Sequence, residues 1–324
     1  MSFRVRLYLD LAPESDTFSV DVLGGLKQSP KSIPSKYFYD GRGSQLFDEI
    51  CELDEYYLTR TEMAILEDNM GAITDRLGTS AILVEYGSGS SLKTRMLLDA
   101  LPDADAYVPV DISRDHLLMA SEHIQERYPN LRVLPVCADY SQPIPLNLVP
   151  TPGSRISVFF PGSTIGNFKP AEAVDFLSRL GDVVGPGGGV LLGVDLVKDE
   201  DVLRAAYNDA SGVTAAFNRN VLIHANARLG ADFQPERFDH EAIWNADASR
   251  IEMHLISREP HIVRIGEDAI ELERGESILT EYSHKYTLTA FRDLVSEAGF
   301  EVDRVWTDDR SWFSLQYLVA GPRA

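Results

Sequence analysis

The sequence has few cysteines, no clustered histidines and no long apolar run, and each shortage excludes a class of protein. Cys51 and Cys137 are the only cysteines and lie far apart, so a disulfide framework is not indicated. The seven histidines form neither an H-x-x-x-H nor an H-E-x-x-H pattern, so we expect no metal site. No stretch approaches the roughly 18 apolar residues of a membrane span, and "MSFRVRLYLDLAPESD" at the start contains no apolar segment of signal length. We therefore expect a cytoplasmic protein with no membrane partner.

Positive charge is also scarce. Thirty Lys and Arg residues against 50 Asp and Glu residues give a formal net charge of 30 − 50 = −20. Such an excess disfavours binding to nucleic acid phosphates, so we expect no nucleic-acid partner. We interpret the charge as one that keeps the protein soluble, and we expect a monomer. The 324 residues are enough to bury one large core, or a main core and a smaller one.

The middle of the chain alternates strand-like and helix-like segments. Continuous apolar runs occupy residues 81–86, 106–111, 131–139, 155–163 and 188–195, and helical patterns separate them. This order is typical of βαβ units with a mostly parallel sheet that is covered on both faces. The chain ends with "EVDRVWTDD" and "WFSLQYLVA", two strands joined by a short turn. We therefore expect an α/β fold with a seven-stranded sheet, in which the terminal hairpin supplies one antiparallel strand near the edge.

The alternation of strands and helices breaks after residue 195. "RIEMHLISRE" places Ile251, Met253 and Leu255 on one face and mostly polar residues, with Ile256, on the other, which is typical of an antiparallel sheet with one solvated face. This change predicts a second, α+β domain. We expect the core to comprise residues 61–195 and 286–324, and the second domain to comprise residues 1–60 and 196–285.

The stretch "VEYGSGSSLKTR" is a buried strand followed by a glycine turn and a helix. Gly87 and Gly89 would let the backbone approach a ligand closely. Position 92 is leucine, so the dinucleotide pattern G-x-G-x-x-G fails, and no G-x-x-x-x-G-K pattern is present. The glycines alone are also compatible with a plain tight turn.

Carboxylates at three strand ends extend this pattern. Glu85, Asp111 and Asp139 are separated by one βα unit each. In an open parallel sheet, ligands bind beyond the carboxyl ends of the strands. Asp111 could accept both hydroxyls of a ribose, and Asp139 could accept the exocyclic amine of adenine. Because nothing except the helix N-terminus would neutralise a pyrophosphate, S-adenosylmethionine fits best. The alternative is that these aspartates only cap helices and turns.

Longer motifs carry a resemblance to a known family. They are "KYFYDGRGSQLFDEI", "EYYLTRTE", "FFPGSTIGNF", "AYNDASGVTAAFNRN" and "LTEYSHKY". Through them the sequence resembles the histidine-specific methyltransferases of ergothioneine biosynthesis, which make Nα-trimethylhistidine (hercynine). The resemblance implies a class I Rossmann-like methyltransferase core and a substrate-binding domain that closes over the amino acid.

The resemblance also implies a set of site residues. The expected contacts to S-adenosylmethionine are Gly87, Lys93, Asp111, Asp139 and Tyr140. The backbone of L-histidine would be held by Tyr56, Asn167 and Tyr207, and its imidazole would be bound by Glu281 and Ser283. Tyr39 and Phe217 would line the space where the amine is methylated, and Met253 would pack near the imidazole. Tyr39, Tyr56 and Asn167 form the implied catalytic set. Without the resemblance, the tyrosines would be interpreted as core or interface aromatics and Glu281 as a surface carboxylate.

The implied activity is S-adenosylmethionine-dependent Nα-trimethylation of L-histidine, with no metal. Within the same fold, an alternative is N-methylation of another aromatic amino acid such as tryptophan, or of a ring nitrogen of histidine. A third hypothesis is a cofactor-binding regulatory protein without catalysis. The polar pair Glu281 and Ser283 favours histidine, because an imidazole ring can form hydrogen bonds with both side chains.

Overall fold

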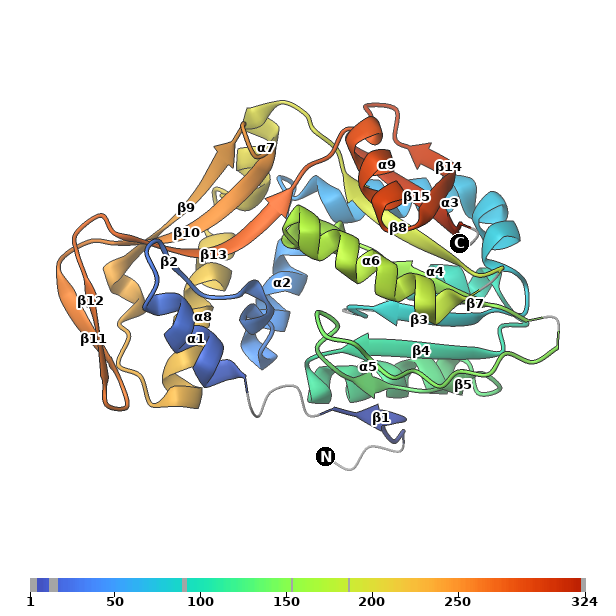
Figure 1. Cartoon of the computed structure of the whole chain (residues 1–324), viewed down its shortest axis with the longest axis horizontal. Helices are drawn as coiled ribbons and strands as arrows, with labels where there is room; N and C mark the ends of the chain where they lie inside the picture. Colours follow the sequence, from blue (N-terminus) through green and yellow to red (C-terminus); the bar gives the residue numbers. More distant parts are fainter. Residues whose placement is uncertain (1–4, 12–16, 89–91, 153, 186, 322–324) are drawn as a thin grey trace. The chain divides into compact units, whose positions relative to one another are not determined.

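The computed structural model describes residues 5–11, 17–88, 92–152, 154–185 and 187–321. Its internal contacts divide the chain into two compact units (Figure 1). The first unit comprises Met1–Pro13, Leu58–Val197 and Lys285–Ala324, and the second comprises Glu14–Tyr57 and Lys198–His284. Each unit is therefore built from segments that are distant in the sequence.

The first unit contains a mostly parallel sheet. Within the described residues it has nine strands: β1 (Leu9–Asp10), β3 (Ile82–Tyr86), β4 (Ala106–Asp111), β5 (Arg132–Val133), β6 (Val136–Cys137), β7 (Ile156–Phe160), β8 (Gly189–Asp195), β14 (Phe300–Thr307) and β15 (Phe313–Ala320). Their order is β1-β6-β4-β3-β7-β8-β15-β14, with β5 paired to β4. Among these strands, β15 alone runs in the opposite direction, and it lies between β8 and the edge strand β14. The expected α/β class, the mostly parallel sheet and the antiparallel strand from the terminal hairpin are confirmed.

The number of strands differs from the expected seven. The apolar run 131–139 forms two short strands, β5 and β6, because Pro135 interrupts it and has no N–H group to donate to a ladder. The additional strand β1 pairs with β6, and the N–H of Leu11 donates to the carbonyl of Cys137 (2.9 Å). Residues 5–11 therefore belong to the first unit, whereas the sequence predicts that they belong to the second domain. The functional roles of the two units remain predictions.

Helices cover both faces of this sheet. They are α3 (Tyr57–Leu77), α4 (Leu92–Ala100), α5 (Arg114–Arg127), the short 3₁₀ helix η2 (Thr164–Asn167), α6 (Pro170–Val184) and α9 (Leu288–Glu297). Helix α6 buries Ala173, Phe176, Leu177, Leu180 and Val184, a stripe with helical spacing, against β7 and β8. Helices α6 and α9 lie side by side (Figure 1). Strands β3, β7 and β8 are buried along their whole length, as expected for strands covered on both faces.

The second unit contains a smaller, mostly antiparallel sheet. The order is β2 (Lys31–Ser32), β13 (Ser277–His284), β10 (Arg250–Ser257) and β9 (Phe238–Asn245), and β11 (His261–Ile265) forms a separate hairpin with β12 (Asp268–Leu272). Its helices are α1 (Phe18–Leu26), η1 (Ser35–Phe38), α2 (Gly41–Cys51), α7 (Glu200–Tyr207), α8 (Val213–Leu229) and η3 (Pro235–Arg237). Burial alternates along β10, so the expected buried face of Ile251, Met253 and Leu255 is confirmed.

Candidate active site

The order of the large sheet reverses at β3. Strands β4 and β6 follow on one side of β3, and β7 and β8 follow on the other. Gly87 comes directly after β3 with φ +73°, a conformation that favours glycine, and its N–H donates to the carbonyl of Val110 (2.9 Å). Among the described residues other than Gly87 and its two chain neighbours, no atom lies within 4 Å of the position that a Cβ on Gly87 would take. The backbone at this switch point can therefore approach a ligand closely. Gly89 lies outside the described residues.

Asp111 and Asp139 occupy the neighbouring strand ends, as expected. Asp111 is the last residue of β4, and its Oδ1 accepts a hydrogen bond from the N–H of Ser113 (2.9 Å). Asp139 follows β6, and its Oδ1 accepts from the N–H of Ser141 (2.9 Å). Both aspartates thus stabilise turns, which is the alternative role that the sequence left open. Because a carboxylate can accept about four hydrogen bonds, this role is compatible with ligand binding.

Glu85 differs from the other two strand-end carboxylates because it is enclosed. Its side chain is 1% exposed, and one oxygen accepts hydrogen bonds from the hydroxyls of Thr94 (2.6 Å) and Tyr107 (2.5 Å). Burial raises the pKa of Glu85 to about 7, although the two hydroxyl hydrogen bonds oppose this shift. Glu85 therefore joins α4 to β3 and β4 inside the fold and is not a ligand position.

Tyr140 belongs to an aromatic cluster over the sheet. Its ring centroid lies 5.8 Å from that of Phe160, 6.0 Å from Phe176 and 6.1 Å from Tyr86. Tyr86 itself is 3% exposed, and burial raises the pKa of its phenol. Tyr86 contacts the expected cofactor residue Tyr140 with the edge-to-face geometry that aromatic pairs prefer.

Lys93 has a buried partner that sequence reasoning missed. Its Nζ lies 2.5 Å from Oε2 of Glu62, a carboxylate on α3 that is 0% exposed. The same Oε2 accepts a hydrogen bond from the N–H of Gly162, which follows β7 (2.9 Å). A Cβ on Gly193 would lie 2.4 Å from Oε1 of Glu62, so a larger residue there would displace this carboxylate. Glu62 therefore joins the first turn of α4 to the end of β7. The motif "EYYLTRTE", which ends with Glu62, was the signal in the sequence that could have identified this residue.

The loop that carries Asn167 is held in a sparsely populated backbone conformation. Gly162 and Ser163 are consecutive residues with positive φ (+77° and +60°), and the second is not glycine. The Ser163 hydroxyl oxygen accepts a hydrogen bond from the N–H of Asp195 (2.9 Å). The Asp195 carboxylate in turn forms an ion pair with Lys285 (2.7 Å), and both side chains are 0% exposed. Such support is needed because a residue of this kind costs of the order of 1–3 kcal/mol.

In the second unit, the aromatic residues among the predicted site residues form a continuous cluster with one further ring, that of Phe47. We define it as Tyr39, Phe47, Tyr56, Tyr207 and Phe217. The ring centroids of Tyr39 and Phe217 are 5.8 Å apart, and those of Tyr56 and Tyr207 are 6.2 Å apart. Phe47 joins the two pairs, at 6.0 Å from Phe217 and 6.2 Å from Tyr56. Phe47 was not predicted as a site residue, although it lies in the motif "GSQLFDEI". Rings of this kind attract cationic groups to their faces.

Polar groups lie at one end of the aromatic cluster. The hydroxyls of Tyr207 and Ser283 are 2.7 Å apart, and both residues are buried. Glu281 lies opposite Met253 in the β10–β13 ladder. Burial raises the pKa of Tyr56 well above 10, and the negative charge of Glu281 adds to this shift. The second unit therefore brings Glu281, Ser283 and Met253 to the tyrosines that the sequence associated with them.

The turn between α7 and α8 joins the helices that carry Tyr207 and Phe217, two members of the aromatic cluster. Tyr207 is the last residue of α7, and Asp209 accepts hydrogen bonds from the N–H groups of Val213 (3.0 Å) and Thr214 (2.8 Å) at the start of α8. The hydroxyl of Ser211 also donates to Asp209 (2.6 Å). Burial alone would raise the pKa of Asp209, but these hydrogen bonds hold it well below its usual range. The motif "AYNDASGVTAAFNRN" thus encodes a capped helix entry.

The remaining predicted site residues belong to the first unit: Gly87, Lys93, Asp111, Asp139, Tyr140 and Asn167. Across the residues that the structure describes, no group of three or more His, Cys, Asp or Glu side chains could hold a metal ion. Over the same residues, no helix has the length and apolarity needed to cross a bilayer.

A mostly parallel sheet with one antiparallel strand beside its edge, together with the glycine turn and carboxylates at the switch point, is the arrangement expected of an S-adenosylmethionine-dependent methyltransferase. The chain belongs to the histidine-specific, S-adenosylmethionine-dependent methyltransferase family, whose model matches residues 18–320. It is 44% identical over 324 residues to the histidine N-alpha-methyltransferase of Mycolicibacterium smegmatis, covering 98% of this chain and 100% of that protein. It is 43% identical over 300 residues to the Mycobacterium tuberculosis protein of the same name (91% and 92% covered). Ergothioneine biosynthesis protein 1 of Neurospora crassa is 30% identical over 292 residues, which cover 87% of this chain and 32% of that protein.

Proposed function

We propose that the protein transfers methyl groups from S-adenosylmethionine to the α-amino nitrogen of L-histidine, yielding Nα-trimethylhistidine for ergothioneine biosynthesis. The observation that carries this proposal is the arrangement in the second unit, where an aromatic cluster meets Glu281 and the hydrogen-bonded pair Tyr207 and Ser283. Family membership and the names of the bacterial relatives support the choice of histidine.

The first unit is the proposed binding site for S-adenosylmethionine. Among the described residues, nothing fills the space beside Gly87, which fits a ligand that approaches the turn closely. Asp111 would accept hydrogen bonds from the ribose hydroxyls, and Asp139 would accept one from the adenine amine, with Tyr140 next to it. Lys93 would contribute positive charge for the carboxylate of the ligand. When bound, S-adenosylmethionine supplies an electrophilic methyl group on a sulfonium.

A second set of side chains is the proposed binding site for the amino acid. Tyr56, Tyr207 and Asn167 would hold its backbone. Glu281 would accept the ring N–H of the imidazole, Ser283 would bind the ring, and Met253 would pack against it. A carboxylate that accepts a ring N–H favours an imidazole over an apolar ring, so a substitute such as phenylalanine is rejected. Hydrogen bonding of this kind discriminates better than apolar contact alone.

Catalysis in this proposal depends mainly on positioning, because methyl transfer is an in-line displacement. The amine must be neutral to attack, and each methylated product except the last must lose a proton before the next transfer. Tyr56 stays an uncharged phenol near neutral pH because burial raises its pKa. It can therefore accept a hydrogen bond from the amine or donate one to it, but it does not act as a phenolate base. The faces of Tyr39 and Phe217 suit the growing alkylammonium through cation–π attraction.

Two rival functions make different predictions. A methyltransferase for tryptophan, or for a ring nitrogen of histidine, would use the same fold but would not need Glu281 to accept a ring N–H. A cofactor-binding regulatory protein would bind S-adenosylmethionine and transfer no methyl group. The aromatic cluster, joined to Tyr207 and Ser283, favours catalysis on a small aromatic acceptor.

The proposal is tested by incubating the protein with S-adenosylmethionine and each of the twenty amino acids, with mass spectrometry to count added methyl groups. We expect histidine alone to gain three. N-acetylhistidine, whose α-nitrogen is blocked, should gain none. Transfer to N-acetylhistidine would place the chemistry on the ring. Transfer to no amino acid, with binding of S-adenosylmethionine retained, would support the regulatory alternative.

We further propose that the protein works as a cytoplasmic monomer. The net charge of −20 and the absence of a cysteine framework support this, since neither Cys51 nor Cys137 forms a disulfide. Gel filtration with light scattering would test the monomer.

A further inference from the structure

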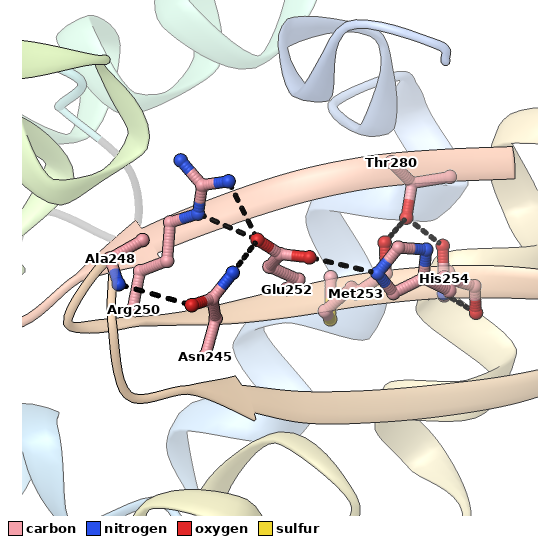
Figure 2. Close-up of polar contacts among 8 residues, drawn as sticks. Asn245, Ala248, Arg250, Glu252, Met253, His254 and Thr280 are labelled. Atoms are coloured by element: carbon pink, nitrogen blue, oxygen red, sulfur yellow. Dashed lines mark hydrogen bonds and ion pairs between the residues drawn. The ribbon is translucent and has the colours of Figure 1, made fainter. Parts of the chain in front are cut away.

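Strand β13 contains a bulge next to the proposed imidazole site. In the ladder with β10, Glu281 lies opposite Met253, but the next pair joins His254 to Leu279. Thr280 is therefore an extra residue with no partner position on β10. Figure 2 shows Thr280 on one strand with its hydrogen bond to Met253 on the next. Bulges of this kind change the direction of the side chains that follow them.

The bulge decides which face of the sheet carries the proposed ring-binding residues. Side chains alternate along a regular strand, so from the buried Ile278 onward Thr280 would share the buried face and Glu281 would point the other way. The extra residue shifts this alternation by one position. Glu281 then pairs with Met253 on the buried face of β10, and Ser283 is on the same side. Without the bulge, both residues would lie on the opposite face.

Two buried side chains hold the interrupted part of the ladder. The hydroxyl of Thr280 has two acceptors within reach, the carbonyl oxygen of Met253 (3.0 Å) and Oδ1 of Asn218 (2.7 Å). The Nδ2 of Asn218 donates to the carbonyl oxygen of His254 (3.1 Å). Thr280 is 2% exposed and Asn218 is 0% exposed. Side chains thus bond to the carbonyls of the two residues between which the register shifts.

The same asparagine connects the bulge to α7. Its Nδ2 also donates to Nδ1 of His240 (2.8 Å), and Nε2 of His240 lies 2.8 Å from the carbonyl oxygen of Tyr207. Since Nδ1 accepts, Nε2 carries the proton and donates to Tyr207. This tautomer is uncharged, and burial lowers the pKa of His240, which favours the same form. A fully satisfied buried network of this kind specifies one arrangement of its members.

We infer that Thr280 and Asn218 are positioning residues that hold the β13 bulge, and thereby fix Glu281 and Ser283 on the side of the sheet where the acceptor's ring binds. His240 connects Asn218 to the carbonyl of Tyr207 through its two ring nitrogens. The inference rests on the proposed function for the identity of the acceptor. It predicts that the affinity for the acceptor depends on two side chains that touch no ligand.

The test compares three variants for steady-state kinetics with histidine and with tryptophan, and for S-adenosylmethionine affinity by calorimetry. Thr280→Val removes the hydroxyl but keeps the shape of the side chain. Thr280→Ser restores a hydroxyl. Ser257→Ala is the control, because it removes a buried hydroxyl of the neighbouring strand β10, which bonds to the carbonyl of Glu259 (2.8 Å) at the far end of that strand.

We expect Thr280→Val to raise KM for histidine about tenfold or more, since a buried acceptor loses its partner and the bulge relaxes. The ratio of kcat/KM for histidine to that for tryptophan should fall. Affinity for S-adenosylmethionine should change by less than about twofold, because the affected residues belong to the second unit. Thr280→Ser should return KM to within about threefold of the wild type, and Ser257→Ala should leave KM near the wild-type value.

An unchanged KM in Thr280→Val, or an equal rise in Ser257→Ala, would overturn the inference. If Thr280→Val does not fold, Asn218→Asp replaces it, since it keeps the acceptor for Thr280 and removes the donor to His254; an unchanged KM there would also overturn it. The wild type in the same series separates this inference from the proposed function. If the wild type methylates a different amino acid, the proposed substrate is wrong, and the variants are then compared on that acceptor.

Discussion

The ion pair between Glu62 and Lys93 supports a strong prediction, because its two partners are unequally buried and one is fully enclosed. Glu62 is 0% exposed and Lys93 is 18% exposed, with Nζ and Oε2 2.5 Å apart. Replacing Glu62 with glutamine keeps the shape and keeps an oxygen for the N–H of Gly162, but it removes the charge. Breaking a buried pair by changing one partner costs about 3–5 kcal/mol. We expect about 3 kcal/mol for Glu62→Gln, because the Gly162 contact survives.

A matched control lies on the surface of the second unit. Glu49 pairs with Arg42 at 3.1 Å, and both side chains are about half exposed (50% and 54%). Glu49→Gln should therefore lower the free energy of unfolding by less than about 1 kcal/mol. Urea denaturation gives both values. In a cycle with Lys93→Met, the double variant should be less destabilised than the sum of the single variants. The reasoning is refuted if Glu62→Gln and Glu49→Gln lose the same stability, or if the cycle shows no coupling.

Three further predictions concern other carboxylates. The folded protein keeps Glu85 protonated up to about pH 7, whereas in the unfolded chain this carboxyl ionises near pH 4.5, so wild-type stability falls as the pH rises through this window. Glu85→Gln lacks this loss. The free energy of unfolding of Glu85→Gln relative to the wild type, measured by urea denaturation, should therefore grow by about 3 kcal/mol from pH 4.5 to 7.5. Asp111→Ala should weaken S-adenosylmethionine binding roughly ten- to a hundredfold by losing a charge-assisted acceptor, and unchanged calorimetric affinity would count against it. Glu281→Ala should lower kcat/KM for histidine by a factor that corresponds to about 1–3 kcal/mol of lost binding, and it should reduce the ratio of kcat/KM for histidine to that for tryptophan. If that ratio is unchanged, Glu281 does not bind the ring.

Much of the first unit could be predicted from the sequence because its signals are local. Each apolar run is long enough to define a buried strand, and the following helix defines a βαβ unit. Gly87, Asp111 and Asp139 lie at strand ends, and the carboxyl ends of parallel strands meet at one edge of a sheet. The stop of α9 before Gly299, which has φ +83°, was predictable for the same reason, since glycine favours that conformation.

Other features depend on residues that are distant in the sequence, and only the tertiary structure decided them. Glu85 has the same position in its strand as a ligand residue would, but Thr94 and Tyr107 enclose it. The partner of Lys93 is on another helix, 31 positions away. Neither contact has a periodic signal in the sequence.

The face that Glu281 occupies is the clearest case. The alternation that predicted the buried side of β10 holds along that strand, but on β13 the extra residue Thr280 reverses it. A one-residue shift moves every following side chain to the other face of a sheet. Sequence determined that "LTEYS" forms a strand with polar residues. Whether Glu281 and Ser283 lie on the face of Met253 and Ile251 was decided by the ladder with β10 and by the buried Asn218 on a separate helix, because register depends on the neighbouring strand and not on the residues of the strand itself.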